Sequence, residues 1–155
     1  MGNKLKHNNK ELLNKKMYGF EKLIVWQKAM DFCKQIYHIT KSFPEEERFG
    51  LTSQLRRASY SIPTNIAEGS ASKSKKEFRY FLIIALRSQY ETITLLKLSY
   101  NLNFLNKTQY EELFIKCDEV GKLLNALIKS QKELKQRTSN NRKEKSGNRQ
   151  QETGN

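Results

Sequence analysis

The chain has 155 residues, with 29 lysines and arginines against 16 aspartates and glutamates, and its formal net charge at pH 7 is +13. This length suffices for one compact domain and little more. An excess of positive charge attracts polyanions, so it indicates the kind of partner rather than the fold. No apolar run approaches the roughly 18 residues of a membrane span, and the amino end lacks the apolar stretch of a secretory signal. We therefore expect a cytoplasmic protein with no membrane partner.

The surplus charge is concentrated at the two ends of the sequence. Residues 1–19 are rich in Asn and Lys, and residues 136–155 contain no side chain able to build a core. Segments of this composition bury too little apolar area to offset the entropy lost on ordering. We predict a flexible basic arm over 1–19, a helical bundle domain over 20–135 and a disordered basic tail over 136–155.

The first predicted helix spans residues 22–41. Its apolar positions recur with a helical period. The predicted core stripe contains Trp26, Met30, Cys33, Tyr37 and Thr40, widened by Ala29 and Ile36. Cys33 and Cys117 both fall on apolar stripes, which favours reduced cysteines in a protein core.

The second predicted helix begins soon after Pro44, where the glutamates of residues 45–47 suit the positive end of a helix dipole. Its core stripe is Leu51, Leu55, Ala58, Ile62 and Ile66. Pro63 lies inside this pattern and removes the hydrogen bond to the Ser59 carbonyl, so we predict a kink within one helix. Gly69 is expected to end the helix as a left-handed C-cap.

Two capping boxes mark the remaining helices. Ser74 and Glu77 open a third helix that runs to about Leu102, and Thr108 and Glu111 open a fourth. No alternating pattern typical of strands accompanies these periods. Four helices with short loops predict an all-α fold, an antiparallel up-down four-helix bundle with a Pro-kinked second helix.

The third helix is apolar on two sides. The first of its apolar faces is formed by Phe78, Phe81, Leu82, Ala85, Thr92 and Leu96. The second is formed by Tyr80, Ile84, Leu95, Leu98 and Leu102. A helix that is apolar all round is usually buried, and a four-helix bundle cannot cover every side of one member. We predict that the second face is a homo-oligomer interface, and the alternative is a monomer in which the fourth helix or the arm covers it.

A polar stripe follows one flank of the second helix. It consists of Gln54, Arg57, Ser61, Asn65 and Glu68, at 3-4-4-3 spacing. Such a stripe could be a ligand site, but a hydrogen-bonded network that fixes helix packing or subunit contacts is the favoured interpretation. We predict that Arg57 is partly buried and paired with Glu91. Arg56 is expected to point elsewhere, toward solvent near Tyr60, where it could contact phosphate and base.

Three segments resemble a known family. They are FEKLIVWQKAMDF, FPEEERFGLTSQLRRASYSIPTNIAEGS and KEFRYFLIIALRSQYET. They are similar to the four-helix-bundle proteins encoded in intervening sequences of bacterial 23S ribosomal RNA, a family that includes the accessory variability proteins of diversity-generating retroelements. The resemblance covers roughly residues 20–130, and the segment over 54–69, with Pro63 inside a helix, carries most of its specificity.

The resemblance implies an up-down bundle with a basic surface. In the accessory relatives it implies a five-subunit ring that binds RNA or DNA together with a reverse transcriptase. The chain departs from the family pattern at Arg87, where relatives often have glycine. The charge of Arg87 must therefore face solvent or find a partner such as Glu91.

The sequence contains no recognisable catalytic constellation. His7 and His38 have no Cys, Asp or Glu at metal-ligand spacing, and the glycines form no phosphate-binding loop. We therefore predict no enzyme activity, no cofactor and no metal site. The leading hypothesis is an accessory protein that binds RNA or DNA as a homo-oligomer, for which the resemblance implies a pentamer, and the alternative is a protein–protein scaffold. The predicted phosphate contacts are Arg56, Lys73, Lys75, Lys76 and Arg79.

Overall fold

The described part of the chain is entirely helical. The computed structural model describes the backbone of residues 17–151 and the side chains of residues 17–131. In chain order its elements are the 3-10 helix η1 (Gly19–Lys22), α2 (Ile24–Ile39), the 3-10 helices η2 (Thr40–Ser42) and η3 (Glu45–Glu47), α3 (Leu51–Ser70), α4 (Lys75–Asn101) and α5 (Lys107–Gln151). No strand occurs within these residues, which confirms the predicted all-α class.

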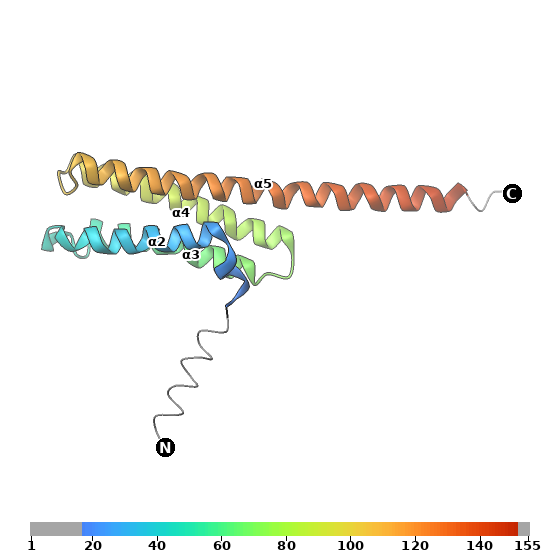
Figure 1. The fold of residues 1–155 in the computed structure, drawn as a ribbon, viewed down its shortest axis with the longest axis horizontal. Helices are drawn as coiled ribbons and strands as arrows, with labels where there is room; N and C mark the ends of the chain where they lie inside the picture. The colour runs from blue at the N-terminus through green and yellow to red at the C-terminus, as the bar shows by residue number, and fades with distance from the viewer. Residues whose placement is uncertain (1–16, 152–155) are drawn as a thin grey trace, which may run out of the picture.

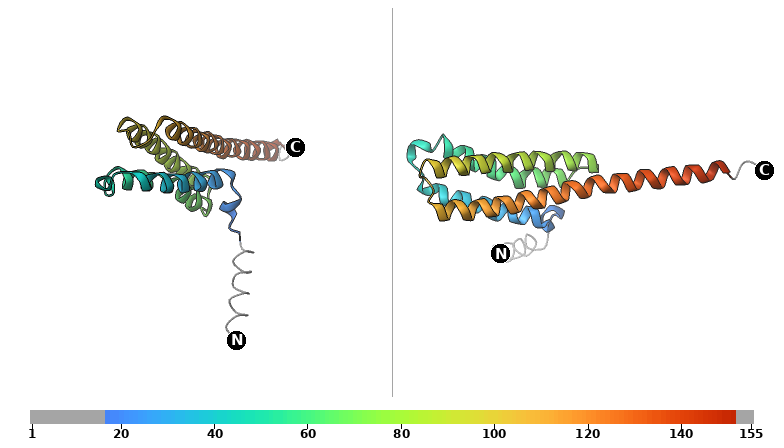
Figure 2. Two further views of the ribbon diagram at one scale, coloured as in Figure 1. Left: turned by 60° about the vertical axis from the view of Figure 1, so that its left-hand side comes forward. Right: turned by 90° about the horizontal axis from the view of Figure 1, so that it is seen from above.

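The four α-helices form an antiparallel bundle. Figure 1 shows that consecutive helices run in opposite directions, and Figure 2 shows the same arrangement from two further sides. α2 packs on α3, α3 on α4, α4 on α5, and α5 returns to α2. The bundle is therefore closed on itself, with one apolar core at its centre. None of the helices over residues 17–151 carries an apolar stretch long enough to cross a lipid bilayer.

The core stripes of α3, α4 and α5 lie close to where the sequence placed them. The residues predicted for α3, from Leu51 to Ile66, are all buried. On α5 the buried positions are Leu113, Cys117, Val120 and Leu124. Burial raises the pKa of Cys117 to about 12, and it also raises the pKa of Cys33. Both thiols are therefore neutral at pH 7.

The core stripe of α2 differs from the predicted one. Its buried residues are Val25, Ala29, Phe32, Cys33 and Ile36. Tyr37, which the sequence analysis placed in the core, is 42% exposed. α2 lies between α3 and α5, so the centre of its buried face falls between its two neighbours. Tyr37 is on the edge toward α3, where its ring meets an arginine rather than apolar side chains.

Several helix ends differ from the predicted caps. The glutamates of residues 45–47 form η3 instead of the first turn of α3, but the Oε2 atom of Glu47 still accepts the N–H of Leu51 at 2.7 Å. Ser74 caps α4 as predicted, because its Oγ accepts the N–H of Glu77 at 3.2 Å. α5 begins one residue before Thr108.

The capping box of α5 is formed by Asn106 and Gln109. Each of these side chains accepts the backbone N–H of the other residue at 2.9 Å. The prediction of Thr108 and Glu111 was therefore wrong in register by two residues. Asparagine satisfies the free N–H groups of a first turn as well as serine or threonine does, so the residue types alone allowed both positions.

Gly69 does not act as a left-handed cap. α3 runs through Pro63 and Gly69 to Ser70, and no glycine in the described residues has a positive φ. A Cβ atom at position 69 would lie 2.6 Å from the Cβ of Phe81 and 2.9 Å from a ring carbon of Phe78. Glycine is required here because α3 and α4 approach each other closely beside their connection.

α5 is much longer than the other helices. Its 45 residues rise about 68 Å, against about 40 Å for the 27 residues of α4. Figure 1 shows it continuing well beyond the bundle. The sequence analysis expected disorder over 136–155, but the backbone is helical as far as Gln151. These residues extend a helix that is already formed within the bundle, and extending a helix costs less than starting one. Residues 1–16, most of the predicted arm, and residues 152–155 lie outside the described residues.

Candidate nucleic-acid interface

Three of the predicted phosphate contacts lie together at one end of the bundle. Lys73, Lys75 and Lys76 are exposed on the α3–α4 connection and the first turn of α4. None of them forms an ion pair with a side chain in residues 17–131. Figure 1 shows η1 at the same end, and α5 leaves the bundle there. The backbone N–H groups of the first turn of α4 add further donors at this place.

Arg79 is near these lysines but is a different kind of residue. It lies one turn further along α4 and is only partly exposed. Its Nε atom is buried and has no hydrogen-bond partner among the described residues. The three lysines are therefore open to a phosphate, whereas the Nε atom of Arg79 is not.

Arg56 does not belong to this cluster. The Nε atom of Arg56 donates to the Oγ1 atom of Thr40 at 2.8 Å, and its guanidinium carbon lies 5.1 Å from the centre of the Tyr37 ring. The side chain therefore crosses from α3 to α2 rather than pointing to solvent beside Tyr60. Fourteen residues separate Arg56 from Ser70 at the end of α3, a rise of about 21 Å. A long flexible side chain can contact an adjacent helix, and spacing on its own helix does not reveal this.

One half of the polar stripe on α3 is an ion-pair network with α4. The Nη2 atom of Arg57 donates to the Oε1 atom of Glu91 at 2.5 Å, and its Nε donates to Gln54 at 3.1 Å. The predicted pair of Arg57 with Glu91 is therefore present, and its side chains are 52% and 40% exposed, so the pair is about half in water. Arg87 is exposed and is not the partner of Glu91 in this structure.

The other half of the stripe is a hydroxyl and amide network. The Oγ atoms of Ser61 and Ser88 lie 3.0 Å apart across the α3–α4 contact. The Nδ2 atom of Asn65 donates to the carbonyl of Ser61 at 2.8 Å and to its Oγ at 3.1 Å. Glu68, at the end of the stripe, is exposed, and its carboxylate makes no hydrogen bond or ion pair with the described side chains. The sequence analysis omitted Ser88, although its position three residues before Glu91 places it on the same face.

The second apolar face of α4 is only partly exposed. Tyr80, Leu98 and Leu102 are 59%, 44% and 46% exposed, so α5 does not cover them. Ile84 is half-buried, and Leu95 packs against the core of its own chain. Three of the five predicted interface residues thus form a surface that an additional partner could cover.

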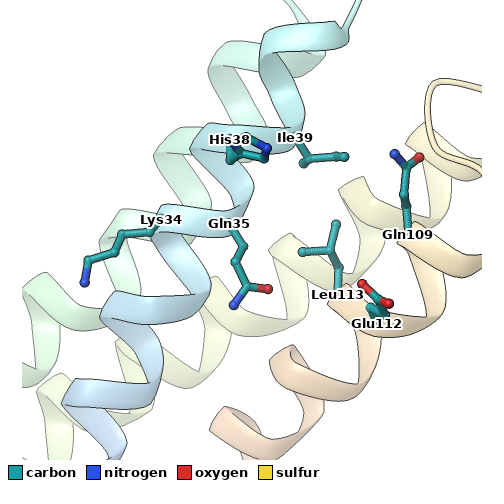
Figure 3. Close-up of a pocket in the computed structure, with 7 residues that line it drawn as sticks. All are labelled: Lys34, Gln35, His38, Ile39, Gln109, Glu112 and Leu113. Carbon is teal, nitrogen blue, oxygen red and sulfur yellow. The ribbon is translucent and has the colours of Figure 1, made fainter.

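A pocket of about 400 Å³ lies between α2 and α5. Its lining residues are Lys34, Gln35, His38, Ile39, Gln109, Glu112 and Leu113. Figure 3 shows Glu112 and Leu113 on α5 facing α2, while Lys34 points away from α5. The carboxylate of Glu112 makes this pocket unsuited to a polyanion. Among the side chains of residues 17–131, no three metal-binding groups lie together.

Comparisons with known proteins identify the bundle. Residues 21–126, which include α2, α3, α4 and the first half of α5, match the family described as 23S rRNA-intervening sequence protein. A crystal structure of a protein of unknown function from the S23 ribosomal protein family of Bacteroides thetaiotaomicron is 31% identical in sequence. The match covers 68% of this chain and 99% of that chain, with a TM-score of 0.65. No curated protein matches the chain.

Proposed function

We propose that this chain, which belongs to the family of 23S rRNA-intervening sequence proteins, binds nucleic acid as an oligomeric accessory protein. The observation that carries the proposal is the unpaired lysine cluster of Lys73, Lys75 and Lys76, located where α5 leaves the bundle. In sequence, residues 129–151 of α5 add Lys129, Lys132, Lys135, Arg137, Arg142, Lys143, Lys145 and Arg149 against Glu133 and Glu144. Two basic segments that are distant in sequence therefore start from the same end of the molecule.

The expected mode of binding is electrostatic. Each ammonium group that neutralises a phosphate releases a condensed counterion, so the logarithm of the affinity falls with the logarithm of the salt concentration by about 0.7–0.9 per contact. These contacts recognise the charge and spacing of phosphates and carry no base sequence. We therefore expect binding to both RNA and DNA with little sequence preference.

The test is fluorescence anisotropy of labelled RNA and DNA with the full-length chain. One variant carries Lys73→Glu, Lys75→Glu and Lys76→Glu. A matched control carries Lys107→Glu, Lys116→Glu and Lys122→Glu, which makes the same change of net charge along the exposed side of α5. The first variant should lose most of its affinity and show a flatter salt dependence, whereas the control should lose much less.

Two results would contradict the proposal. If the unaltered chain shows no salt-sensitive binding to RNA or DNA, it does not act through phosphates. If both triple variants weaken binding equally, net charge is responsible and the lysine cluster is not the interface. Circular dichroism melting of the three proteins excludes unfolding as the cause.

The oligomeric part of the proposal is supported by the exposed part of the α4 face, Tyr80, Leu98 and Leu102. Light scattering at micromolar concentration should give a mass well above 18.3 kDa. Leu98→Glu with Leu102→Glu should shift the protein to a folded monomer, since a charge at a buried apolar contact is costly. This pair is a better test than Ile84 and Leu95, because Leu95 also packs against the core. A monomeric unaltered protein would contradict it.

The same exposed apolar surface favours a second candidate function, a protein–protein scaffold. Exposed apolar patches on soluble proteins mark contact sites for other proteins. In that case the partner is another protein, such as a reverse transcriptase, and the basic segments serve solubility. Co-purification from the native host separates the two functions, because recovery of nucleic acid that survives removal of protein partners favours the first.

A further inference from the structure

A second concave surface lies on α2 next to the pocket in Figure 3, and the two share Lys34 and His38 in their linings. It is a pocket of about 340 Å³ lined by Met30, Cys33, Lys34, Tyr37, His38 and Lys41. Unlike the pocket between α2 and α5, its lining contains no carboxylate. It lies beside α3, because Cys33 contacts Ser59 and Tyr37 contacts Arg56. We call it the α2–α3 groove.

The α2–α3 groove has the aromatic ring of Tyr37 in its lining, and a positioned cation of α3, Arg56, lies against that ring. The ring of Tyr37 is 42% exposed, and the guanidinium carbon of Arg56 lies 5.1 Å from its centre. The buried hydroxyl of Thr40 accepts the Nε of Arg56 at 2.8 Å, which fixes the direction of the side chain. Tyr60, 45% exposed, lies four residues after Arg56 and therefore on the same row of α3.

The positive charge in the α2–α3 groove is not neutralised within the groove. Both contacts of Arg56 are neutral groups, a hydroxyl and a ring. Lys41 is exposed and has no ion-pair partner among the described side chains. Lys34 pairs with Asp31 at 3.1 Å, but both side chains are about two-thirds or more exposed, so the pair is weak. The groove therefore offers cations to an anion and a ring face to a planar group.

We infer that the α2–α3 groove binds single-stranded nucleic acid, with an unstacked base against Tyr37 and the adjoining phosphate at Arg56 and Lys41. Stacking on an aromatic side chain requires a base whose face is free, and a duplex does not present one. This inference rests on the proposed function, since it assumes that the protein binds nucleic acid. It adds a site separate from the lysine cluster and a preference for single strands.

The test compares a labelled 12-nucleotide single strand with its duplex, using the full-length chain. Tyr37→Leu keeps an apolar side chain but removes the ring, and Tyr90→Leu is the control, since Tyr90 is 62% exposed on α4. Tyr37→Leu should lower the affinity for the single strand by about 5- to 150-fold, the range measured for one stacked base, and leave duplex affinity unchanged. Tyr37→Trp should retain the affinity.

Arg56→Gln tests the phosphate part of the site. Glutamine can still donate to Thr40 but carries no charge, so the salt dependence of single-strand binding should become flatter by about one phosphate contact. The inference is overturned if the Lys73, Lys75 and Lys76 variant loses binding while Tyr37→Leu binds the single strand normally, and the proposed function then stands. It is also overturned if Tyr37→Leu weakens single-strand and duplex binding equally. If the unaltered chain binds neither form, the proposed function fails first.

Discussion

The two flanks of α3 carry neighbouring arginines with different surroundings. Toward α4, Arg57 pairs with the carboxylate of Glu91, and the adjacent Ser61 contacts Ser88. Toward α2, the Arg56 side chain donates to the hydroxyl of Thr40 and lies against the ring of Tyr37, and it forms no ion pair with the described side chains. One flank therefore has its charge compensated within the protein, whereas the other keeps a positive charge beside an open groove.

This difference shows why polar spacing on a helix is not sufficient evidence for a site. The stripe from Gln54 to Glu68 is the more regular of the two flanks, but its hydrogen bonds to Glu91 and Ser88 hold α3 against α4. The α2 flank has no such regularity in sequence. Whether an arginine of α3 is paired depends on the residues that the neighbouring helix places against it. The spacing of polar residues along α3 gives no information about them.

The largest expected effect on the α4 flank comes from Gly69→Ala. The added Cβ would lie 2.6 Å from the Cβ of Phe81, so α3 and α4 must separate. Overpacking of this kind costs about 1–3 kcal/mol, and we expect a corresponding fall in the free energy of unfolding measured by urea denaturation. Gly19→Ala is the control, because nothing lies within 4 Å of a Cβ at that position. Unchanged stability for Gly69→Ala would mean that α3 and α4 are not closely packed at this position.

A smaller effect is expected from Ser61→Ala. The substitution removes the contact with the Ser88 hydroxyl, but Ser88 still donates to the carbonyl of Ile84 at 3.2 Å and Asn65 still reaches the Ser61 carbonyl. The loss should therefore be that of one hydrogen bond, about 1 kcal/mol. Ser53→Ala, at an exposed position of the same helix, should change the melting temperature little. Equal effects of the two substitutions would count against a network between α3 and α4.

Much of the bundle could be predicted from the sequence because periodicity reports burial directly. The stripe from Leu51 to Ile66 and the cap at Ser74 follow from local patterns, and both are present. The role of Gly69 could not be predicted, because it depends on the distance to Phe81 across the helix contact. Glycine after an apolar stripe fits a C-cap equally well.

The residues of the candidate sites could be predicted only where their availability to a ligand depends on exposure alone. Lys73, Lys75 and Lys76 lie on the α3–α4 connection and the first turn of α4, so their exposure follows from chain topology. The direction of the Arg56 side chain depends on Tyr37 of α2 and Thr40 of η2. Tyr37 was itself assigned to the core, because a period of 3.6 does not distinguish the middle of a stripe from its edge.

The smallest effect on stability is expected from Arg57→Ala, although its pair with Glu91 is the shortest polar contact across the two helices. The two side chains are 52% and 40% exposed, and ion pairs that remain in water contribute about 0.2–1 kcal/mol. A double-mutant cycle of Arg57→Ala and Glu91→Ala, followed by urea denaturation, should therefore give a coupling energy below about 1 kcal/mol, and Arg87→Ala should show none with Glu91. Raising the salt concentration should reduce the coupling further, since exposed pairs are screened.

A coupling of about 3–5 kcal/mol would instead mean that the pair of Arg57 and Glu91 is shielded from water in solution. Because no described side chain covers the pair, that result would place a second subunit over the α4 flank. The variant with Leu98→Glu and Leu102→Glu should then reduce the coupling to the value of an exposed pair.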